Sequence, residues 1–272
     1  MSATIATPRP VTGSGLSAGG TIRSEWIKLR SLRSTVWSYA IVIVVSLGLS
    51  WVLSSSLANA DFGPPTGSPE HALVQASTFG VTFGVLVVGV LGVLVISGEY
   101  STGMIRSTLT AVPKRTPALL AKAFVLFVTT FVVGLLATVG SGIVSYLVLT
   151  SHGIEPAITG EVVSGVLLAA TYLAAVSVFA LGLGTVLRSS AGGIAAALGV
   201  LLLLPTIVMV FAGITQAEWA RDLLPYLLSN AGEAMVLARE GGLEQWQSAL
   251  VVAAWALVPL AGGVLLLKRR DA

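Results

Sequence analysis

Six long apolar stretches divide this chain, and none of them contains Asp, Glu, Lys, Arg or His. Each stretch is close to the roughly 20 residues that a helix needs to cross about 30 Å of hydrocarbon. Because a charged side chain is costly at the centre of a bilayer, charge-free runs of this length are typical of transmembrane helices. The predicted spans lie near residues 35–57, 73–97, 123–149, 162–187, 192–214 and 247–267.

The composition excludes an ordinary soluble protein. Of the 272 residues, 55% are apolar and only 10% are charged, and the mean hydropathy is +0.92. A soluble domain carries roughly 25% charged residues, because it has to cover itself with polar surface. We therefore predict an all-α fold, an integral membrane six-helix bundle. The absence of cysteine excludes disulfides, thiolate nucleophiles and Cys-type zinc sites.

The charges of the connections predict the orientation of the bundle. If the N-terminus is cytoplasmic, 13 of the 15 basic residues fall on the cytoplasmic side and nine of the twelve acidic residues fall outside. The outer connections then hold only Arg221 and Arg239 as bases. The positive-inside rule therefore predicts that both termini are cytoplasmic. A net charge of +3 does not by itself indicate nucleic acid, and no nucleic-acid partner is expected.

A signal peptide is the competing interpretation of the first apolar run, because Ala58-Asn59-Ala60 imitates a cleavage site. The apolar core of a signal peptide is only about 7–15 residues long, whereas this run approaches 20. Cleavage would also leave an odd number of spans. We favour a retained first span.

Two segments precede the first span. Residues 1–20 are rich in Pro, Gly, Ser and Thr and predict a disordered cytoplasmic tail. Residues 21–33 place apolar side chains at helical spacing among bases, which predicts an amphipathic interfacial helix. The residues assigned to that helix surface are Arg23, Trp26, Lys28, Arg30 and Arg33. Residues 21–270 are expected to form one six-span domain.

Two connections carry more pattern than a plain turn. The second, residues 98–122 (GEYSTGMIRSTLTAVPKRTPALLAK), is long and basic, and two prolines favour a helix end, a turn and a new helix start. The fifth, roughly 216–246, is too apolar for a loop and too short for a span. With Pro225 interrupting it, the fifth connection predicts an outer re-entrant or interfacial helix before the last span.

The basic segment 24–33 (SEWIKLRSLR), the 98–122 connection and the six spans together resemble the type-2 ABC transporter permease family. The likeness runs from about residue 21 to 270. It implies a subunit of a bacterial cell-membrane exporter that pairs with a second permease copy or paralogue and with separate ABC ATPase subunits. ATP and Mg would sit on the ATPase, and no cofactor is expected here. The chain indeed contains no G-x-x-x-x-G-K-[ST] loop.

The resemblance also implies a cytoplasmic coupling helix at about 99–113 that docks on the ATPase. Glu99 and Arg106 are seven residues apart and would share one side of it. The alternative is a solvated face whose bases attract membrane lipids. The coupling residues implied are Glu99, Tyr100, Met104, Arg106, Lys114 and Arg115.

The spans hold no charge that would mark a substrate path, so polar and aromatic side chains are the candidates. In the second span, Gln75, Thr78 and Thr82 share a helix face, beside Phe79 and Phe83. These residues either line a cavity or make hydrogen bonds between helices. In the fifth span, the run Leu201 to Leu204 before Pro205 resembles the apolar gate of related exporters, although leucine runs also face lipid. From this run, Leu203 and Leu204 are taken as the candidates for the path.

Other kinds of function have less support in the sequence. An intramembrane enzyme would need an acid, base or metal ligand inside a span, and no span offers one. Two isolated histidines, His71 and His152, cannot form a structural zinc site, so no metal is expected. A membrane anchor or sensor subunit stays open as an alternative. The uncharged spans favour a lipophilic or amphipathic substrate, whose identity the sequence does not give.

Overall fold

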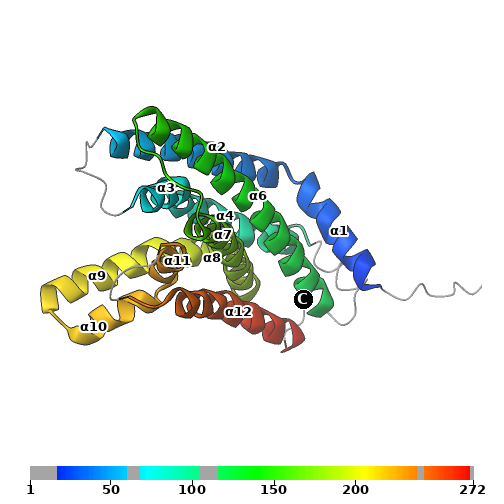
Figure 1. The fold of residues 1–272 in the computed structure, drawn as a ribbon. Helices are drawn as coiled ribbons and strands as arrows, with labels where there is room; N and C mark the ends of the chain where they lie inside the picture. The colour runs from blue at the N-terminus through cyan, green and yellow to red at the C-terminus, as the bar shows by residue number, and fades with distance from the viewer. Residues whose placement is uncertain (1–16, 60–67, 104–115, 238–241, 270–272) are drawn as a thin grey trace, which may run out of the picture.

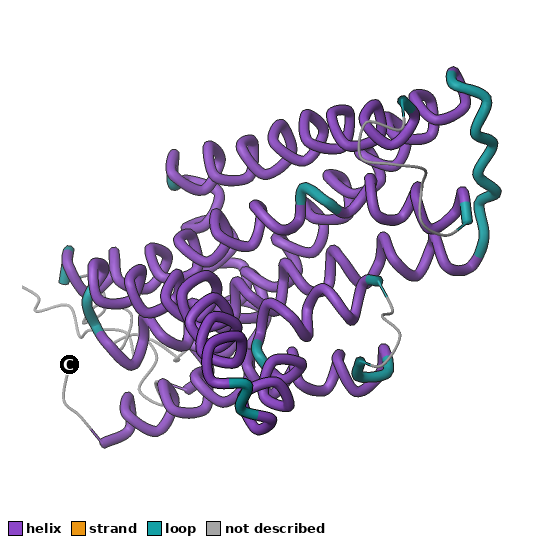
Figure 2. The backbone as a smooth tube through the Cα atoms, turned by 90° about the vertical axis from the view of Figure 1, so that its left-hand side faces the viewer, coloured by secondary structure: helices purple, strands orange, loops and turns teal. Residues whose placement is uncertain are grey.

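The computed structural model describes residues 17–59, 68–103, 116–237 and 242–269 (Figure 1). Within these ranges the chain is helical and contains no strand (Figure 2). The helices are α1 (Ala18–Ser31), α2 (Arg33–Ala58), α3 (Pro69–Thr78), α4 (Val81–Ser101), α6 (Thr116–Ser151), α7 (Gly160–Leu187), α8 (Ser190–Leu198), η1 (Gly199–Leu203), α9 (Leu204–Thr215), α10 (Glu218–Leu223), η2 (Leu224–Tyr226), α11 (Leu228–Val236) and α12 (Gln245–Arg269).

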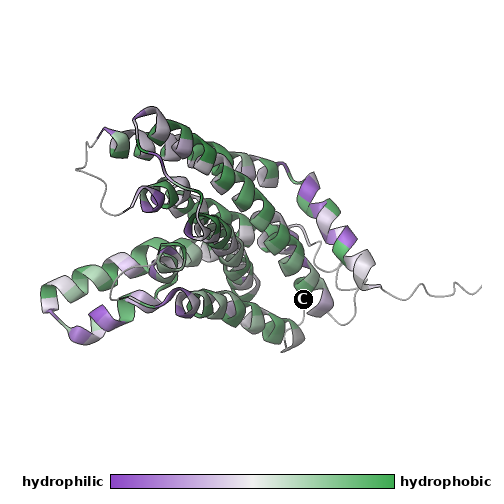
Figure 3. Ribbon diagram, in the orientation of Figure 1, coloured by the Kyte–Doolittle hydropathy of each residue, from purple (hydrophilic) through white to green (hydrophobic). Residues whose placement is uncertain are grey.

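Six helical segments of the described chain are long and apolar enough to cross a membrane, which confirms the predicted all-α six-helix bundle. Several extend beyond the predicted limits, because helices continue past the hydrocarbon-length core that hydropathy detects. The segments are Arg33–Ala58, Pro69–Ser101, Thr116–Ser151, Gly160–Leu187, Ser190–Thr215 and Gln245–Leu267. Figure 3 shows that these helices are mostly hydrophobic along their length, whereas hydrophilic residues gather on α1 and α10.

Helix α7 is the centre of the bundle, and α4, α6 and α12 pack against it. Glycines permit the close approach. A Cβ at Gly92 of α4 would lie 2.3 Å from the carbonyl oxygen of Ser177, and a Cβ at Gly182 would lie 2.6 Å from the backbone nitrogen of Leu260 in α12. In lipid, helix association depends on such tight packing, because burying apolar surface offers little driving force there.

Helix α2 packs along α6 through polar side chains at buried positions. The Ser50 hydroxyl donates to the carbonyl oxygen of Ser141 at 2.8 Å and lies 2.6 Å from the Ser145 hydroxyl. Nearer α1, the hydroxyls of Tyr39 and Thr130 are 2.9 Å apart. These interhelical hydrogen bonds satisfy polar groups that lipid could not solvate.

Two spans are interrupted. The second is divided at Phe79–Gly80 into α3 and α4, and Gly80 lies against Ser46 of α2 where no side chain would fit. The fifth contains the π-helical turn η1, directly before Pro205 near the start of α9. Because proline has no backbone N–H and its ring crowds the preceding turn, a π-turn at this place is expected.

The described part of the connection between the last two spans is mainly helical, as its apolar pattern suggested. Helices α9 and α10 project together away from the bundle (Figure 1), with the rings of Phe211 and Trp219 5.4 Å apart. Helix α11 returns to pack on α7 and α12. There the ring of Tyr172 packs directly against the backbone of Gly232 and leaves no space for a side chain at this position. The Trp255 indole N–H donates to the carbonyl oxygen of Tyr226 at 2.9 Å. Whether this segment is re-entrant or interfacial stays a prediction.

The first helix differs from its predicted limits at both ends. Helix α1 begins at Ala18, because the Ser17 hydroxyl accepts a hydrogen bond from the backbone N–H of Gly20 and caps it. The predicted disordered tail therefore extends too far by three residues; residues 1–16 lie outside the described ranges. The chain breaks at Leu32, whose extended backbone starts a new helix, so Arg33 belongs to α2 rather than to α1.

Candidate functional site

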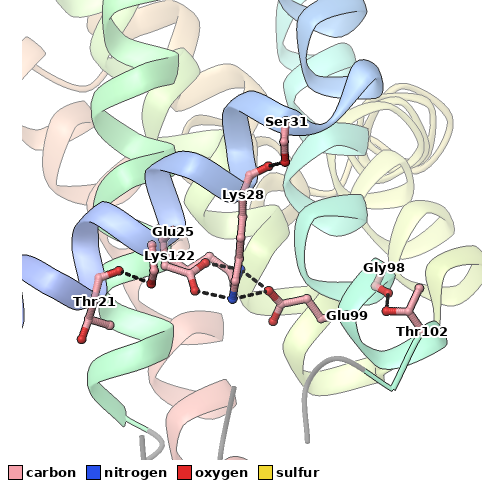
Figure 4. A network of polar contacts seen from close by, with 9 residues as sticks. Thr21, Glu25, Lys28, Ser31, Gly98, Glu99, Thr102 and Lys122 are labelled. Atoms are coloured by element: carbon pink, nitrogen blue, oxygen red, sulfur yellow. Dashed lines mark hydrogen bonds and ion pairs between the residues drawn. The ribbon is translucent and has the colours of Figure 1, made fainter. Parts of the chain in front are cut away.

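Four charged side chains meet where α1, the end of α4 and the beginning of α6 come together. They are Glu25 and Lys28 of α1, Glu99 of α4 and Lys122 of α6, and we call them the ion-pair ring (Figure 4). The two glutamates balance the two lysines. The ring therefore joins the N-terminal helix to both flanks of the second connection.

The contacts of the ring form a closed cycle. The Lys28 ammonium lies 2.7 Å from Glu25 Oε1 and 3.1 Å from Glu99 Oε1. The Lys122 ammonium lies 2.8 Å from the same oxygen of Glu99 and also donates to Glu25 Oε2. Each lysine thus bridges both glutamates, and each glutamate accepts from both lysines (Figure 4).

The ring is largely shielded from water. The exposed fractions of the side chains are 3% for Glu25, 4% for Glu99, 7% for Lys122 and 29% for Lys28. A lone charge buried to this degree would cost several kcal/mol, so the four groups are tolerable only together. Glu99 also lies in the last turn of α4, where the helix dipole disfavours negative charge and the lysines offset it.

Lys28 is cationic within this arrangement. Burial by itself lowers the pKa of its ammonium, but the hydrogen bond to Glu25 and the charges of Glu99 and Glu25 outweigh burial and raise the pKa above its usual value. At this residue the attraction of the two carboxylates therefore exceeds the cost of burial.

The predicted coupling residues are only partly within the described structure. Glu99 and Tyr100 belong to the last turn of α4, which ends at Ser101, so the predicted helix at 99–113 does not begin as a separate element at residue 99. The chain then turns through Gly103 at a positive φ of 70°. Met104, Arg106, Lys114 and Arg115 lie outside the described ranges.

The exposed surface of α1 carries most of the predicted interfacial residues. Arg23, Trp26 and Arg30 are exposed, and so is Arg33 at the start of α2. Lys28 differs, because its side chain points inward to the ion-pair ring.

The sequence did not predict Glu25 and Lys122 as site residues. One sequence feature could have indicated the pairing of these charges: Glu25 and Glu99 are the only acidic residues in the two basic segments 1–34 and 98–122.

The second candidate region is a cavity of about 440 Å³ between α3, α4, η1, α7 and α11. Four predicted path residues line it. The structure adds residues from elements that the prediction did not connect, among them Tyr172 of α7 and the run Ser229, Asn230 and Glu233 of α11. The predicted residues that line it are Gln75, Thr78, Phe79 and Thr82.

Three predicted path residues lie elsewhere. Phe83 is not part of the cavity wall and is exposed on α4. In the leucine run, Leu201 and Leu202 line the cavity instead of Leu203 and Leu204, and Leu203 is 61% exposed. A run of four leucines has no polar member to mark which side faces protein, so hydropathy alone could not choose between them.

The cavity wall is amphipathic. Aromatic and aliphatic side chains are interspersed with the amides of Gln75 and Asn230 and the carboxylate of Glu233. The hydroxyl of Thr78 already donates to the carbonyl oxygen of Val74 at 2.7 Å, so its proton is not available to a ligand in the cavity. Among the described residues, no group of three His, Asp or Glu side chains could hold a metal ion.

Residues 21–198 match the family of ABC-2 family transporter proteins. The match spans most of α1 through α8 and therefore includes the whole ion-pair ring and both flanks of the second connection. No curated protein matches the sequence. The matched segment covers well over half of the chain, and the described chain has six helical segments that can cross a membrane. The chain therefore belongs to the ABC-2 transporter family, as a multi-pass membrane permease subunit of an ABC transporter.

Proposed function

We propose that the chain is the permease of a bacterial exporter and moves a lipophilic or amphipathic substrate outward by alternating access. One observation carries the proposal. The ion-pair ring fastens α1 to the end of α4 and the start of α6, which are the two flanks of the second connection. A force applied to that connection would reach spans two and three and α1 together.

The energy comes from ABC ATPase subunits on separate chains, which hold the ATP and Mg. They dock on the cytoplasmic second connection through its basic residues, with both termini on the same side. Two permease copies, or this chain and a paralogue, form the dimer. When ATP draws the ATPase subunits together, the connection moves, the ring transmits the movement, and the cytoplasmic side closes.

The 440 Å³ cavity is the part of the substrate path that this subunit supplies. Its size falls in the range of small-molecule sites, and its mixture of apolar walls with a few polar groups suits an amphipathic molecule. The cavity is formed by both interrupted spans, α3–α4 and α8–α9. Discontinuous helices typically form the substrate sites of secondary transporters, near the midplane of the membrane.

Copurification with an ATPase tests the central claim. Co-expression with a candidate ABC ATPase subunit from the same organism is expected to yield a stable complex whose ATP hydrolysis exceeds that of the ATPase alone. Inside-out vesicles containing the complex should accumulate substrate in an ATP-dependent manner. A chain that associates with no ATPase would contradict the proposal. A complex that hydrolyses ATP without moving any candidate substrate would favour an anchor or sensor role.

Filling the cavity tests the path. Replacing Thr82 with Trp is expected to reduce ATP-driven transport about tenfold, equivalent to ~1.4 kcal/mol, because the indole occupies space that substrate needs. Assembly with the ATPase should be unchanged. Phe83→Trp is the matched control, since the neighbouring Phe83 does not line the cavity. Equal transport by the two variants would remove the cavity from the path.

A further inference from the structure

A second cavity, of about 490 Å³, lies beside the ion-pair ring between α1, α4 and α6. All four ring residues contribute to its wall. The remainder of the wall is mainly apolar and includes Leu29, Leu94, Val95 and Val125. The cavity therefore has an ionic end and a hydrocarbon-like body, and nothing in the exporter mechanism above uses it.

The ring leaves one hydrogen-bond acceptor unmatched. Three of its four carboxylate oxygens accept from a lysine, but Glu99 Oε2 is buried and has no hydrogen-bond partner among the described residues. A desolvated carboxylate oxygen without a donor is costly, and native proteins rarely leave one. Since no described residue supplies this donor, a ligand in the cavity could supply it.

The chemistry around Glu99 specifies that donor. A primary ammonium group can donate to Glu99 Oε2 and add the positive charge that a carboxylate favours. A phosphate attached to the ammonium would lie near Lys28, the most exposed ring member, and near the Ser34 side chain at the cavity wall. An acyl chain would extend along Leu94 and Val95 toward the apolar body.

We propose that this cavity binds a phospholipid whose head group carries a primary ammonium, of the phosphatidylethanolamine class. The ring is neutral and so is this zwitterionic lipid, so binding adds no net charge at the buried site. An anionic phospholipid such as phosphatidylglycerol would place negative charge beside two buried carboxylates. Phosphatidylcholine has no N–H to donate, because its nitrogen is quaternary.

A membrane lipid fits better than a soluble amine because of where the cavity lies. Its wall follows α4 into the second span, and Trp26 and Ile27 are exposed on the adjacent helix α1. Exposed aromatic and aliphatic side chains beside bases are typical of a helix that lies in the head-group region. The lipid would also wedge α1 against α4 and α6 and so stiffen the ring.

Lipid retention by the purified full-length chain tests the proposal without any ATPase. The chain is stripped of lipid, then exposed to mixed micelles of phosphatidylethanolamine, its mono-, di- and trimethylated forms, and phosphatidylglycerol. Native mass spectrometry counts the lipid retained. We expect at least about tenfold stronger retention of the forms with an N–H than of the trimethylated form, consistent with one charge-assisted hydrogen bond.

Glu99→Gln is expected to abolish this preference, whereas Glu161→Gln should leave it intact. Glu161 is a matched control, because it is an exposed glutamate at the opposite end of the bundle, at the start of α7. If Glu99→Gln does not fold, the charge-balanced pair Glu99→Gln with Lys122→Gln replaces it. Equal retention across the methylation series would overturn the proposal and leave water as the donor to Glu99. Unchanged preference in the Glu99 variants would overturn it as well.

Discussion

Replacing Lys122 with Met is expected to lower the free energy of unfolding by about 3–5 kcal/mol, the usual cost of removing one partner from a buried ion pair. Lys122 is 7% exposed and bridges Glu25 and Glu99, which are buried even more completely. The substitution leaves two carboxylates with Lys28 as their only ammonium partner in the ring. Unfolding in detergent micelles, followed by tryptophan fluorescence, measures the loss.

Two further variants separate charge imbalance from lost packing. Lys28→Met removes the same charge from a side chain that is 29% exposed, so a smaller loss is expected. Adding Glu99→Gln to Lys122→Met restores the charge balance and should recover much of the stability, giving a coupling energy in a double-mutant cycle. If Lys122→Met costs no more than Lys28→Met, the ring is not the buried network described here.

Replacing Gly92 with Ala is expected to destabilise the bundle by about 1–3 kcal/mol, the range for forcing an extra methyl group into a packed core. The new Cβ would lie 2.3 Å from the carbonyl oxygen of Ser177 and 2.9 Å from the Cβ of Ala180. Both atoms belong to the central helix α7. The Ser177 oxygen is a backbone atom, so it cannot move away by a change of rotamer as a flexible side chain can. Helices α4 and α7 would have to separate.

Gly98 provides the control on the same helix. A Cβ at Gly98 would meet nothing within 4 Å, so Gly98→Ala is expected to be neutral or to stabilise by up to ~1 kcal/mol, because alanine loses less backbone entropy in a helix. Thermal unfolding of the detergent-solubilised variants compares the two. Equal melting temperatures would show that α4 and α7 are not held at the described distance.

The number of spans followed from the sequence because the signal is local. Each span satisfies its own backbone hydrogen bonds, and each residue meets the bilayer at a cost that depends mainly on its own side chain. The first and last residues of each span were predicted less accurately. Hydropathy detects the hydrocarbon-length core, so it placed the third span at 123–149, whereas α6 runs from Thr116 to Ser151 and includes Lys122.

The sequence predicted some of the residues that line the 440 Å³ cavity but not others. Helical spacing placed Gln75, Thr78 and Thr82 on one face, and all three line this cavity, because the periodicity of a helix holds across the short break at Phe79–Gly80. Their role in a substrate path stays a prediction. Tyr172 of α7 and Glu233 of α11 could not be added, since both lie far along the chain from the second span. Helix α11 reaches this place only by returning to pack on α7 after the fifth span. Contacts between distant elements leave no periodic trace in one sequence.

The sequence by itself determined an all-α membrane protein of six spans, because the free energy of placing each residue in lipid is nearly independent of the others. The tertiary structure alone decided that the few charges near the spans act together. Lys28 meets Glu99 across 71 positions and Lys122 meets Glu25 across 97. Charge pairing depends on distance in space, so the ring that joins α1, α4 and α6 exists only once these helices have packed.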